Sequence, residues 1–232
     1  MTLKNLVKKL FVPLTVLGVS IVCMSQSNDY REWLEIEVPG GPPPNLLGYL
    51  FSLVATLIFS RDRRDLLNLK IEDSERYLED LPIRSYGEPD IARWCIPHRQ
   101  VSQTAYDIGL EDDVDSDFNK FFNIFTENSN CFIGISEVEN SLPALFLKTS
   151  YQEKEIIHRH TKDGSFHISL SRADASTVVK NKWGELHPLP EFFRQHDETN
   201  ILIYAPQNPD DYKIYSKIIH ASILFYMNKF ST

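Results

Sequence analysis

Apolar and polar residues alternate most regularly in the C-terminal third of the chain. Residues 154–160, KEIIHRH, and residues 165–170, SFHISL, each show the period of two that is typical of a β-strand. Asp163 and Gly164 lie between them and form a turn signal typical of a β-hairpin. We therefore predict two antiparallel strands joined by a short turn.

The length of that turn leaves two strand registers open. With a four-residue turn over 161–164, His158 lies opposite His167 and His160 lies opposite Ser165. With a two-residue Asp-Gly turn, His160 lies opposite His167 instead. Both registers place the three histidines on one face, because side chains alternate along a strand. The period of two sends an apolar set of side chains to the other face, which we therefore expect to pack in the core: Ile157, Phe166, Ile168 and Leu170.

The remaining elements follow from periodicity, caps and breakers. Ser171 and Asp174 resemble a capping box for a helix that runs to about Asn181, where KWGELHPLP breaks it. Asn208-Pro209 opens a last helix. Further strands are expected in NCFIGISEV (130–138), ALFLKTSY (144–151) and NILIYAP (200–206), and further helices in 46–59, 72–82 and 118–125. The predicted fold class is α+β: a small antiparallel β-sheet packed by helices, with an N-terminal membrane-anchor helix.

The N-terminus has the pattern of a membrane-targeting segment. Lys4, Lys8 and Lys9 precede an apolar run over 10–24, after which the chain becomes polar. This run is short for a spanning helix, which needs about 17 to 25 residues, but Leu6 and Val7 extend it. We favour an uncleaved single-pass anchor over a cleaved signal peptide, and we expect it in the membrane of the endoplasmic reticulum.

The chain divides into three predicted parts. Residues 1–25 form the anchor or signal segment, residues 26–44 a Pro/Gly-rich linker that contains PGGPPP, and residues 45–232 a single α+β domain. The apolar stretch over 46–59 suits a buried core helix better than a helix that lies on a bilayer surface.

Size and charge narrow the class of protein. The 232 residues, 42% of them hydrophobic, suffice for one good core. The net charge of −8 argues against nucleic acid as a partner, since such proteins carry basic surfaces.

The histidine face allows two kinds of chemistry. Neutral imidazoles are common metal ligands, and an imidazole also titrates near neutrality and can act as a general base. A polar, solvent-facing sheet surface is the third interpretation. His187 joins the cluster if the loop WGELHPL folds over the sheet. The other histidines have no partner in sequence and are expected on the surface or in the core: His98, His196 and His220.

Several stretches together resemble the luciferase domain of fungal luciferases, the enzymes that oxidise 3-hydroxyhispidin. The resemblance is carried by the order Glu-x-x-His-x-His, a later His, a helix, Trp-Gly-x-x-His-Pro-Leu and Tyr-Ala-Pro, over residues 155–206. REWLEIEVPGGPPPNLLGYLFSL (31–53) and YLEDLPIR (77–84) are also similar to that family. The hairpin loop is one residue shorter than in the luminous enzymes. The resemblance implies a small aromatic pyranone substrate, O2 as co-substrate, loss of CO2 and emission of light. It also implies no cofactor and no bound metal, although the histidines themselves leave metal binding open.

The resemblance further implies roles for individual residues. One of His158, His160 and His167 removes the enol proton, and the others, with His187, hydrogen-bond the enolate and the peroxide. The expected substrate-binding residues are Trp183, Glu185, Tyr204 and Arg84. Two alternatives stay open: a non-luminous homologue that acts on another polyketide or phenolic, and a membrane-tethered module that binds a lipophilic ligand.

Overall fold

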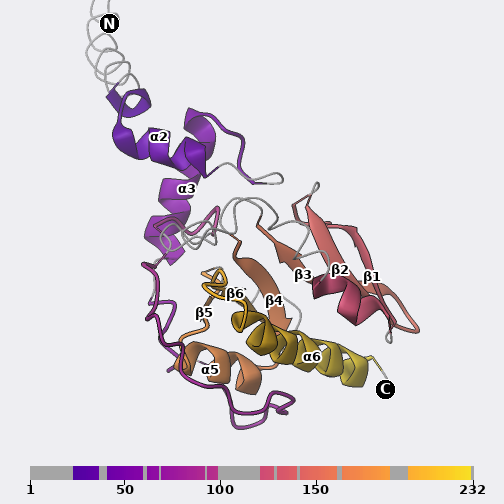
Figure 1. Ribbon diagram of the computed structural model, residues 1–232. Coiled ribbons are helices and arrows are strands. Elements are labelled where there is room, and N and C mark those ends of the chain that lie inside the picture. The colour runs from indigo at the N-terminus through magenta and orange to yellow at the C-terminus, as the bar shows by residue number, and fades with distance from the viewer. Residues whose placement is uncertain are drawn as a thin grey trace, which may run out of the picture.

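The protein is built on one six-stranded sheet (Figure 1). The structure is a computed structural model that describes residues 23–36, 41–59, 62–67, 69–91, 93–98, 121–127, 130–139, 142–160, 164–188 and 198–230. The strands are β1 (Cys131–Ile135), β2 (Pro143–Lys148), β3 (Glu153–Arg159), β4 (Phe166–Leu170), β5 (Gly184–Leu186) and β6 (Thr199–Ile203). They lie in the order β1-β2-β3-β4-β6-β5, and every neighbouring pair is antiparallel.

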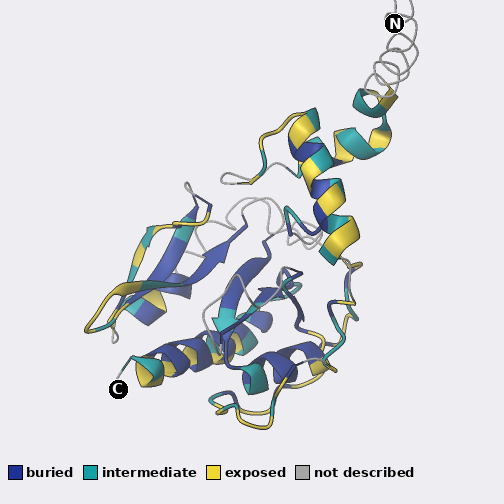
Figure 2. Cartoon of the chain, turned by 180° about the vertical axis from the view of Figure 1, so that it is seen from behind, coloured by how far each residue is buried: buried dark blue, intermediate teal, exposed yellow. Residues whose placement is uncertain are grey.

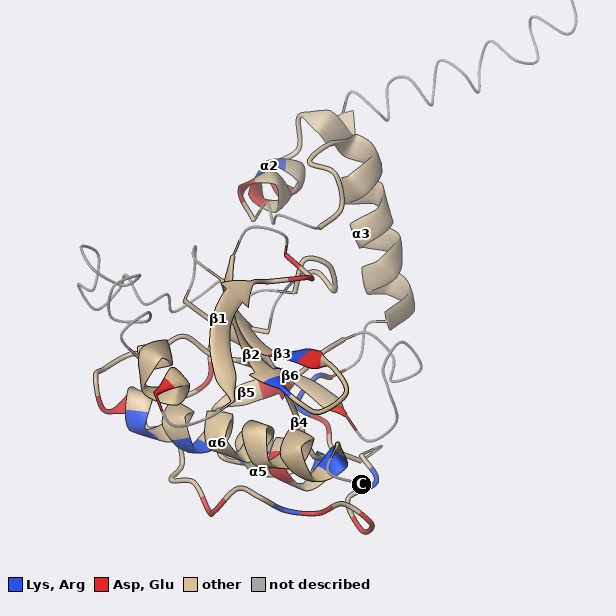
Figure 3. Cartoon of the chain, turned by 90° about the vertical axis from the view of Figure 1, so that its right-hand side faces the viewer, with Lys and Arg blue, Asp and Glu red and all other residues tan. Residues whose placement is uncertain are grey.

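Two helices cover one side of the sheet, α5 (Arg172–Lys180) and α6 (Asp211–Lys229). Figures 1 and 3 show both helices on the same side. Ala175 and Val178 of α5 and Ile218 of α6 share a buried cluster with Ile157 and Ile168 of the sheet. The α+β class is therefore confirmed, and the core lies between these helices and the apolar face of the β3–β4 hairpin.

Most of the predicted elements are present. The expected strands correspond to β1, β2, β3, β4 and β6, and the two C-terminal helices to α5 and α6. Residues 121–126 are helical and overlap the helix predicted over 118–125. The segment KWGELHPLP contains a short edge strand, β5, where we predict only a break.

The prediction of a helix over 72–82 is wrong. This stretch has no helical residues and runs as an extended strap along α5. The buried carboxylate of Asp174 accepts hydrogen bonds from the backbone N–H groups of Tyr77 and Leu78. Ser171 caps α5 as predicted by accepting from the Asp174 N–H. Asp174 therefore satisfies the strap's backbone, which removes its need for helical hydrogen bonds.

Helices α2 (Asn28–Glu35) and α3 (Leu46–Phe59) lie on the other side of the molecule from α5 and α6. Trp33 of α2 and Tyr49 of α3 form a small buried cluster with Trp94. Helix α2 lies inside the segment predicted as a linker, and the division of the chain into domains stays a prediction.

The prediction that residues 46–59 form a buried core helix is wrong about the burial, although they do form α3. One side of α3 is exposed to solvent and apolar, with Leu47, Phe51 and Ile58 exposed by 76%, 56% and 66% (Figure 2). Figure 3 shows that α3 carries no charged side chain along its length. The contacts of α2 and Trp94 cover only its other side.

The predicted membrane anchor, residues 1–25, lies almost entirely outside the described residues. Within the described part of the chain, no helix combines the length and the apolar character that a membrane span requires.

Candidate functional site

The β3–β4 hairpin has the register of the four-residue turn. Ile157 pairs with Ile168 and His158 with His167, and the His160 N–H donates to the Ser165 carbonyl at 2.8 Å. The separation into an apolar face and a histidine face is confirmed. The interpretation of a solvent-facing polar surface is wrong, because His158, His160 and His167 are all buried.

A β-bulge brings a glutamate onto the histidine face. Leu145 of β2 pairs with Ile157 and Phe146 pairs with Glu155, so Ile156 is an extra residue on β3. In a regular strand, residues three apart point to opposite faces. The extra residue reverses this for Glu155 and His158, and Glu155 Oε1 lies 2.6 Å from His158 Nδ1.

Glu155 is held as a carboxylate. Ser136 Oγ donates to it at 3.0 Å and the Glu137 N–H at 2.7 Å. Burial raises the pKa of Glu155, but the hydrogen bond and charge of His158 and the donors from Ser136 and Glu137 lower it further, so that its pKa lies below the ordinary value. An ionised Glu155 places the ring proton of His158 on Nδ1 and leaves Nε2 able to accept a proton. This pair is the carboxylate–histidine dyad.

A second glutamate faces the same histidines. Glu139 is buried, and its Oε1 lies 3.9 Å from His158 Nε2 and 3.5 Å from His160 Nε2. His160 Nδ1 lies 2.8 Å from Ser165 Oγ. Sequence reasoning missed the roles of Glu139 and Glu155. Glu155 is part of the Glu-x-x-His pattern, which was the available signal.

A cavity of about 510 Å³ opens beside the dyad. The hairpin strands share three residue pairs, and the cavity lies where they diverge. Its described lining includes Glu155, His158, His167, Ser169 and Asn200. This volume is typical of a pocket for a small organic molecule.

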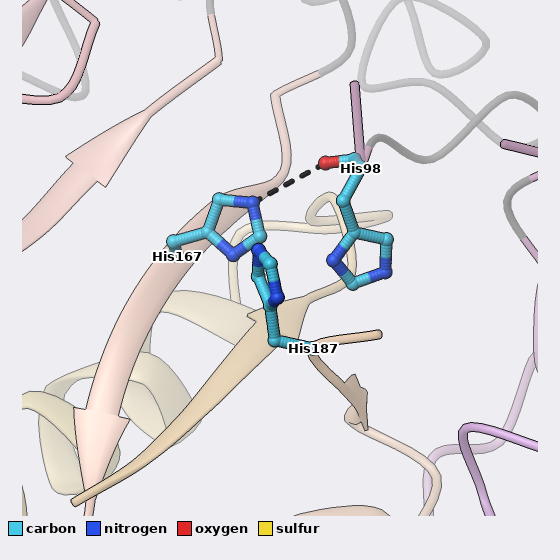
Figure 4. A group of neighbouring side chains, drawn as sticks. All are labelled: His98, His167 and His187. Atoms are coloured by element: carbon cyan, nitrogen blue, oxygen red, sulfur yellow. Dashed lines mark hydrogen bonds between the residues drawn. The ribbon is translucent and has the colours of Figure 1, made fainter. Parts of the chain in front are cut away.

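His98 and His187 lie next to His167 and extend the cluster (Figure 4). The ring centroids of His98 and His187 lie 5.3 and 5.2 Å from that of His167, and 5.0 Å from each other. The sequence leaves open whether His187 joins the cluster. It does so directly after the edge strand β5, and not through a loop that folds over the sheet. The expectation that His98 lies apart from the cluster is wrong. His220 is exposed on α6, and His196 is outside the described residues.

Glu185 connects the cluster to two arginines. Its Oε1 accepts from His98 Nε2 at 2.8 Å and from Arg63 Nη1 at 3.3 Å. Arg64 Nη2 lies 3.9 Å from Oε2. Burial raises the pKa of Glu185, but His98 and Arg63 lower it further, and the net pKa lies below the ordinary value. The carboxylate is therefore ionised and orients the His98 ring.

The other expected substrate-binding residues lie around this network or in the core. The Tyr204 hydroxyl is 3.3 Å from Glu185 Oε2, and burial raises its pKa. Arg84 is buried, donates to the carbonyls of Gly87 and Ala205, and stacks over the Tyr204 ring. Trp183 packs against Tyr215 in the core and donates to the Pro82 carbonyl. Among the described residues that line the cavity, none of Trp183, Glu185, Tyr204 and Arg84 occurs.

Two groups of three histidines have the geometry to hold a metal ion. In each group, one nitrogen of every ring lies within 4.8 Å of the others, and both groups contain His167. The first consists of His98, His167 and His187, and the second of His158, His160 and His167.

Residues 153–222 match the family model of the Luciferase domain. A luciferase of Neonothopanus nambi is 25% identical over 92% of this chain and 85% of its own length. A luciferase of Armillaria mellea is 26% identical over 86% of this chain and 81% of its own length.

No solved structure matches the chain. The matched domain begins at β3 and ends within α6, so it contains four of the five clustered histidines, and His98 lies outside it. Residues 153–222 are similar to the luciferase domain and most of the chain is similar to fungal luciferases, which confirms the family resemblance predicted from its sequence.

Proposed function

We propose that this protein is a membrane-associated, luciferase-like oxygenase that adds O2 to a 3-hydroxy-2-pyranone of the 3-hydroxyhispidin type, with loss of CO2 and emission of light. The observation that carries this proposal is the dyad of Glu155 and His158, 2.6 Å apart, at the wall of a cavity of about 510 Å³. The similarity to proteins named luciferase supports the reaction class.

The dyad begins the reaction by removing a proton. His158 Nε2 takes the proton of the substrate's enol hydroxyl, and the Glu155 carboxylate stabilises the imidazolium that forms. The resulting enolate is electron-rich and transfers an electron to O2, and recombination of the two radicals forms a carbon–oxygen bond to a peroxide. O2 is the co-substrate, and this step requires no organic cofactor.

The peroxide then attacks the lactone carbonyl of the same molecule. The endoperoxide formed in this way breaks its O–O bond, the bond between its two oxygen-bearing carbons and the C–O bond of the lactone ring, so that the former lactone carbonyl leaves as CO2. The released ring oxygen becomes an enolate that takes back the proton held by His158, and the product is formed in an excited state. His160 lies beside His158, with ring centroids 5.8 Å apart, and is placed to hydrogen-bond the developing oxyanions. His167 lies 5.3 Å from His158 on the neighbouring strand and packs beside it.

Membrane association is the second part of the proposal. The apolar segment over 10–24 supplies an anchor, and the exposed apolar side of α3 supplies a surface that lies on the bilayer. Trp94 packs against α2 and α3, and His98 follows four residues later in the cluster. An apolar pyranone dissolved in the membrane therefore has a short path to the site.

The test is oxygen uptake with simultaneous photon counting, on the full chain in detergent supplied with 3-hydroxyhispidin. We expect His158→Ala to reduce turnover by about 10²- to 10⁴-fold, the usual contribution of a general base. Glu155→Gln keeps the shape of the side chain and removes its charge, so it should reduce turnover less. His220→Ala is the control, because His220 is exposed and packs on Phe125 away from the cluster.

Each alternative gives a distinct result. Full activity in His158→Ala would remove the dyad from the mechanism. Oxygen uptake without light on a different phenolic would identify a non-luminous homologue. Saturable binding of the pyranone without oxygen uptake would identify a ligand-binding module.

A further inference from the structure

The cluster of His98, His167 and His187 has a feature that proton abstraction does not use. These side chains come from three separate parts of the chain: the segment 93–98, strand β4 and the end of β5. Figure 4 shows their rings converging, and one nitrogen from each lies within 4.8 Å of the others. Of the three, His98 and His167 are buried and His187 is partly buried.

The outer nitrogens of two rings are fixed as donors. His167 Nε2 lies 3.2 Å from the His98 carbonyl oxygen, which can only accept a hydrogen bond. The proton of a neutral His167 is therefore on Nε2, and its Nδ1 carries a lone pair. His98 Nε2 lies 2.8 Å from Glu185 Oε1, which also accepts from Arg63 Nη1, so the proton of a neutral His98 is on Nε2 and its Nδ1 carries a lone pair.

This arrangement is the one that metal-binding histidines use. Such a histidine donates its outer N–H to a carboxylate or a backbone carbonyl, which sets the tautomer and directs the inner nitrogen to the metal. One acceptor of each type is present here. The same carboxylate also contacts the buried Arg63, whose Nη1 lies 3.3 Å from Glu185 Oε1.

The register of β5 supplies the third ligand. Glu185 and His187 are two residues apart and therefore point to the same face. The His187 N–H donates to the Asn200 carbonyl at 3.0 Å, which fixes the backbone at the end of the strand. Glu185 and Leu202 are paired, and Leu202 pairs with His167, so the three side chains lie side by side across the sheet.

The second histidine triad is less suited to a metal. His158 Nδ1 is bound by Glu155, and the Nε2 atoms of His158 and His160 both face Glu139. The ring nitrogens of this triad therefore face carboxylates, an arrangement suited to acid–base chemistry.

We propose that His98, His167 and His187 bind one divalent transition-metal ion, such as Zn²⁺ or Co²⁺, with Glu185 orienting His98. Three imidazoles with an open fourth position form a site typical of zinc and related metals. The site is built from the protein alone, so its occupancy does not depend on which substrate the dyad serves or on whether light is emitted.

The experiment measures metal binding without substrate. The full chain, carrying no affinity histidines, is stripped with a chelator, dialysed and titrated with Co²⁺, whose visible absorption reports nitrogen coordination. Elemental analysis after Zn²⁺ loading gives the stoichiometry. We expect one equivalent to bind. His187→Ala and the more conservative His187→Gln should weaken binding by more than the roughly 10- to 100-fold that loss of an outer-shell partner costs.

Two controls locate the ion. His220→Ala should bind like the wild type. His160→Ala removes a histidine of the other triad, and its binding should also be unchanged. Thermal unfolding without metal shows whether each variant is folded, and His98→Ala provides a second test if a His187 variant is not.

Three results would overturn the proposal. The first is that Co²⁺ produces no saturable absorption and less than a tenth of an equivalent of zinc binds. The second is that the His187 and His98 variants still bind the metal as the wild type does. The third is that His160→Ala abolishes binding. Because no substrate is present, a failure here is distinct from a failure of the proposed oxygenase reaction.

Discussion

The β3–β4 hairpin and helix α3 are both rich in apolar residues, but those of the hairpin are buried whereas those on one side of α3 are exposed to solvent. In the hairpin, Ile157 and Ile168 are buried against α5 and α6 while the histidines share the opposite face. In α3, Phe51 and Ile58 are exposed although no residue of the helix is charged. The hairpin sequence alternates, so each apolar position has a polar neighbour that fixes which face is buried. The helix sequence has no such contrast, and it predicts an apolar surface without predicting what covers it.

The largest expected effect comes from comparing an alanine substitution on the apolar face of the hairpin with one on its histidine face. Ile168→Ala should cost about 2 to 5 kcal/mol in free energy of unfolding, because it leaves a cavity in a packed core. His167→Ala, one residue earlier on the other face, should cost less and should abolish turnover instead. Urea unfolding and oxygen uptake on both variants measure the two effects. If both variants lost the same free energy of unfolding, the histidine face would be a second core face, and the difference between the two faces would not hold.

The sequence predicts those features that depend on local pattern. The hairpin faces, the Ser171 cap and the start of α6 after Asn208-Pro209 all follow from neighbouring residues. The separation of the imidazoles from the core therefore follows from the order of residues in the hairpin alone.

Features that depend on distant contacts are not predictable in this way. Period-two reasoning assigns Glu155 to the wrong face, because the bulge at Ile156 depends on pairing with β2. His98 joins the cluster from a segment without periodicity, and only the fold brings it to Glu185. The stretch over 72–82 has the amphipathic pattern of a helix, but Asp174, about a hundred residues later, binds its backbone in an extended form.

A smaller effect is the pH dependence of the free energy of unfolding, which should differ between a carboxyl group on the histidine side of the sheet, Glu155, and one on the helix side, Asp174. The folded state lowers the pKa of Glu155 below the ordinary value of 4.5. Its ionised form therefore adds stability that is fully present above about pH 4.5 and is lost as the pH falls through the lower, folded-state pKa. Glu155→Gln should cost roughly 1 to 3 kcal/mol at pH 7, because it removes a charged acceptor, and this cost should shrink below pH 4.5.

Asp174 on the helix side provides a matched control of opposite sign. Burial raises its pKa above the ordinary 3.8, although hydrogen bonds from Leu78, Ser171 and Tyr77 oppose this. Its protonated form is therefore favoured by folding, and the associated stability is lost as the pH rises through the folded pKa. As the pH rises from 3 to 7, the free energy of unfolding of the wild type should fall relative to that of Asp174→Asn. Over the same range it should rise relative to that of Glu155→Gln. Unfolding free energies from pH 3 to pH 7 give both slopes, and two slopes of the same sign would contradict the assignment.

The smallest expected effect on stability lies on α3. Phe51 is exposed, so Phe51→Ser should change the free energy of unfolding in lipid-free buffer by less than about 0.5 kcal/mol. Tyr49 is on the buried side of the same helix, packed against Trp33, and Tyr49→Ser should cost several times more. A large cost at Phe51 would mean that this face is covered within the protein and would remove the contrast with the hairpin.

The same face should respond to lipid where the hairpin does not. A polarity-sensitive fluorophore at Val54→Cys, in a Cys23→Ser background, should shift to the blue when phosphatidylcholine vesicles are added, because Val54 is on the exposed apolar side of α3. Cys95 and Cys131 are buried and should stay unlabelled in the folded protein. The same label at Tyr151→Cys, an exposed position in the β2–β3 turn, should not shift. If the protein binds the vesicles in a flotation assay but the emission of the label at position 54 stays that of an aqueous environment, the N-terminal segment alone binds the membrane. The apolar side of α3 would then need another explanation.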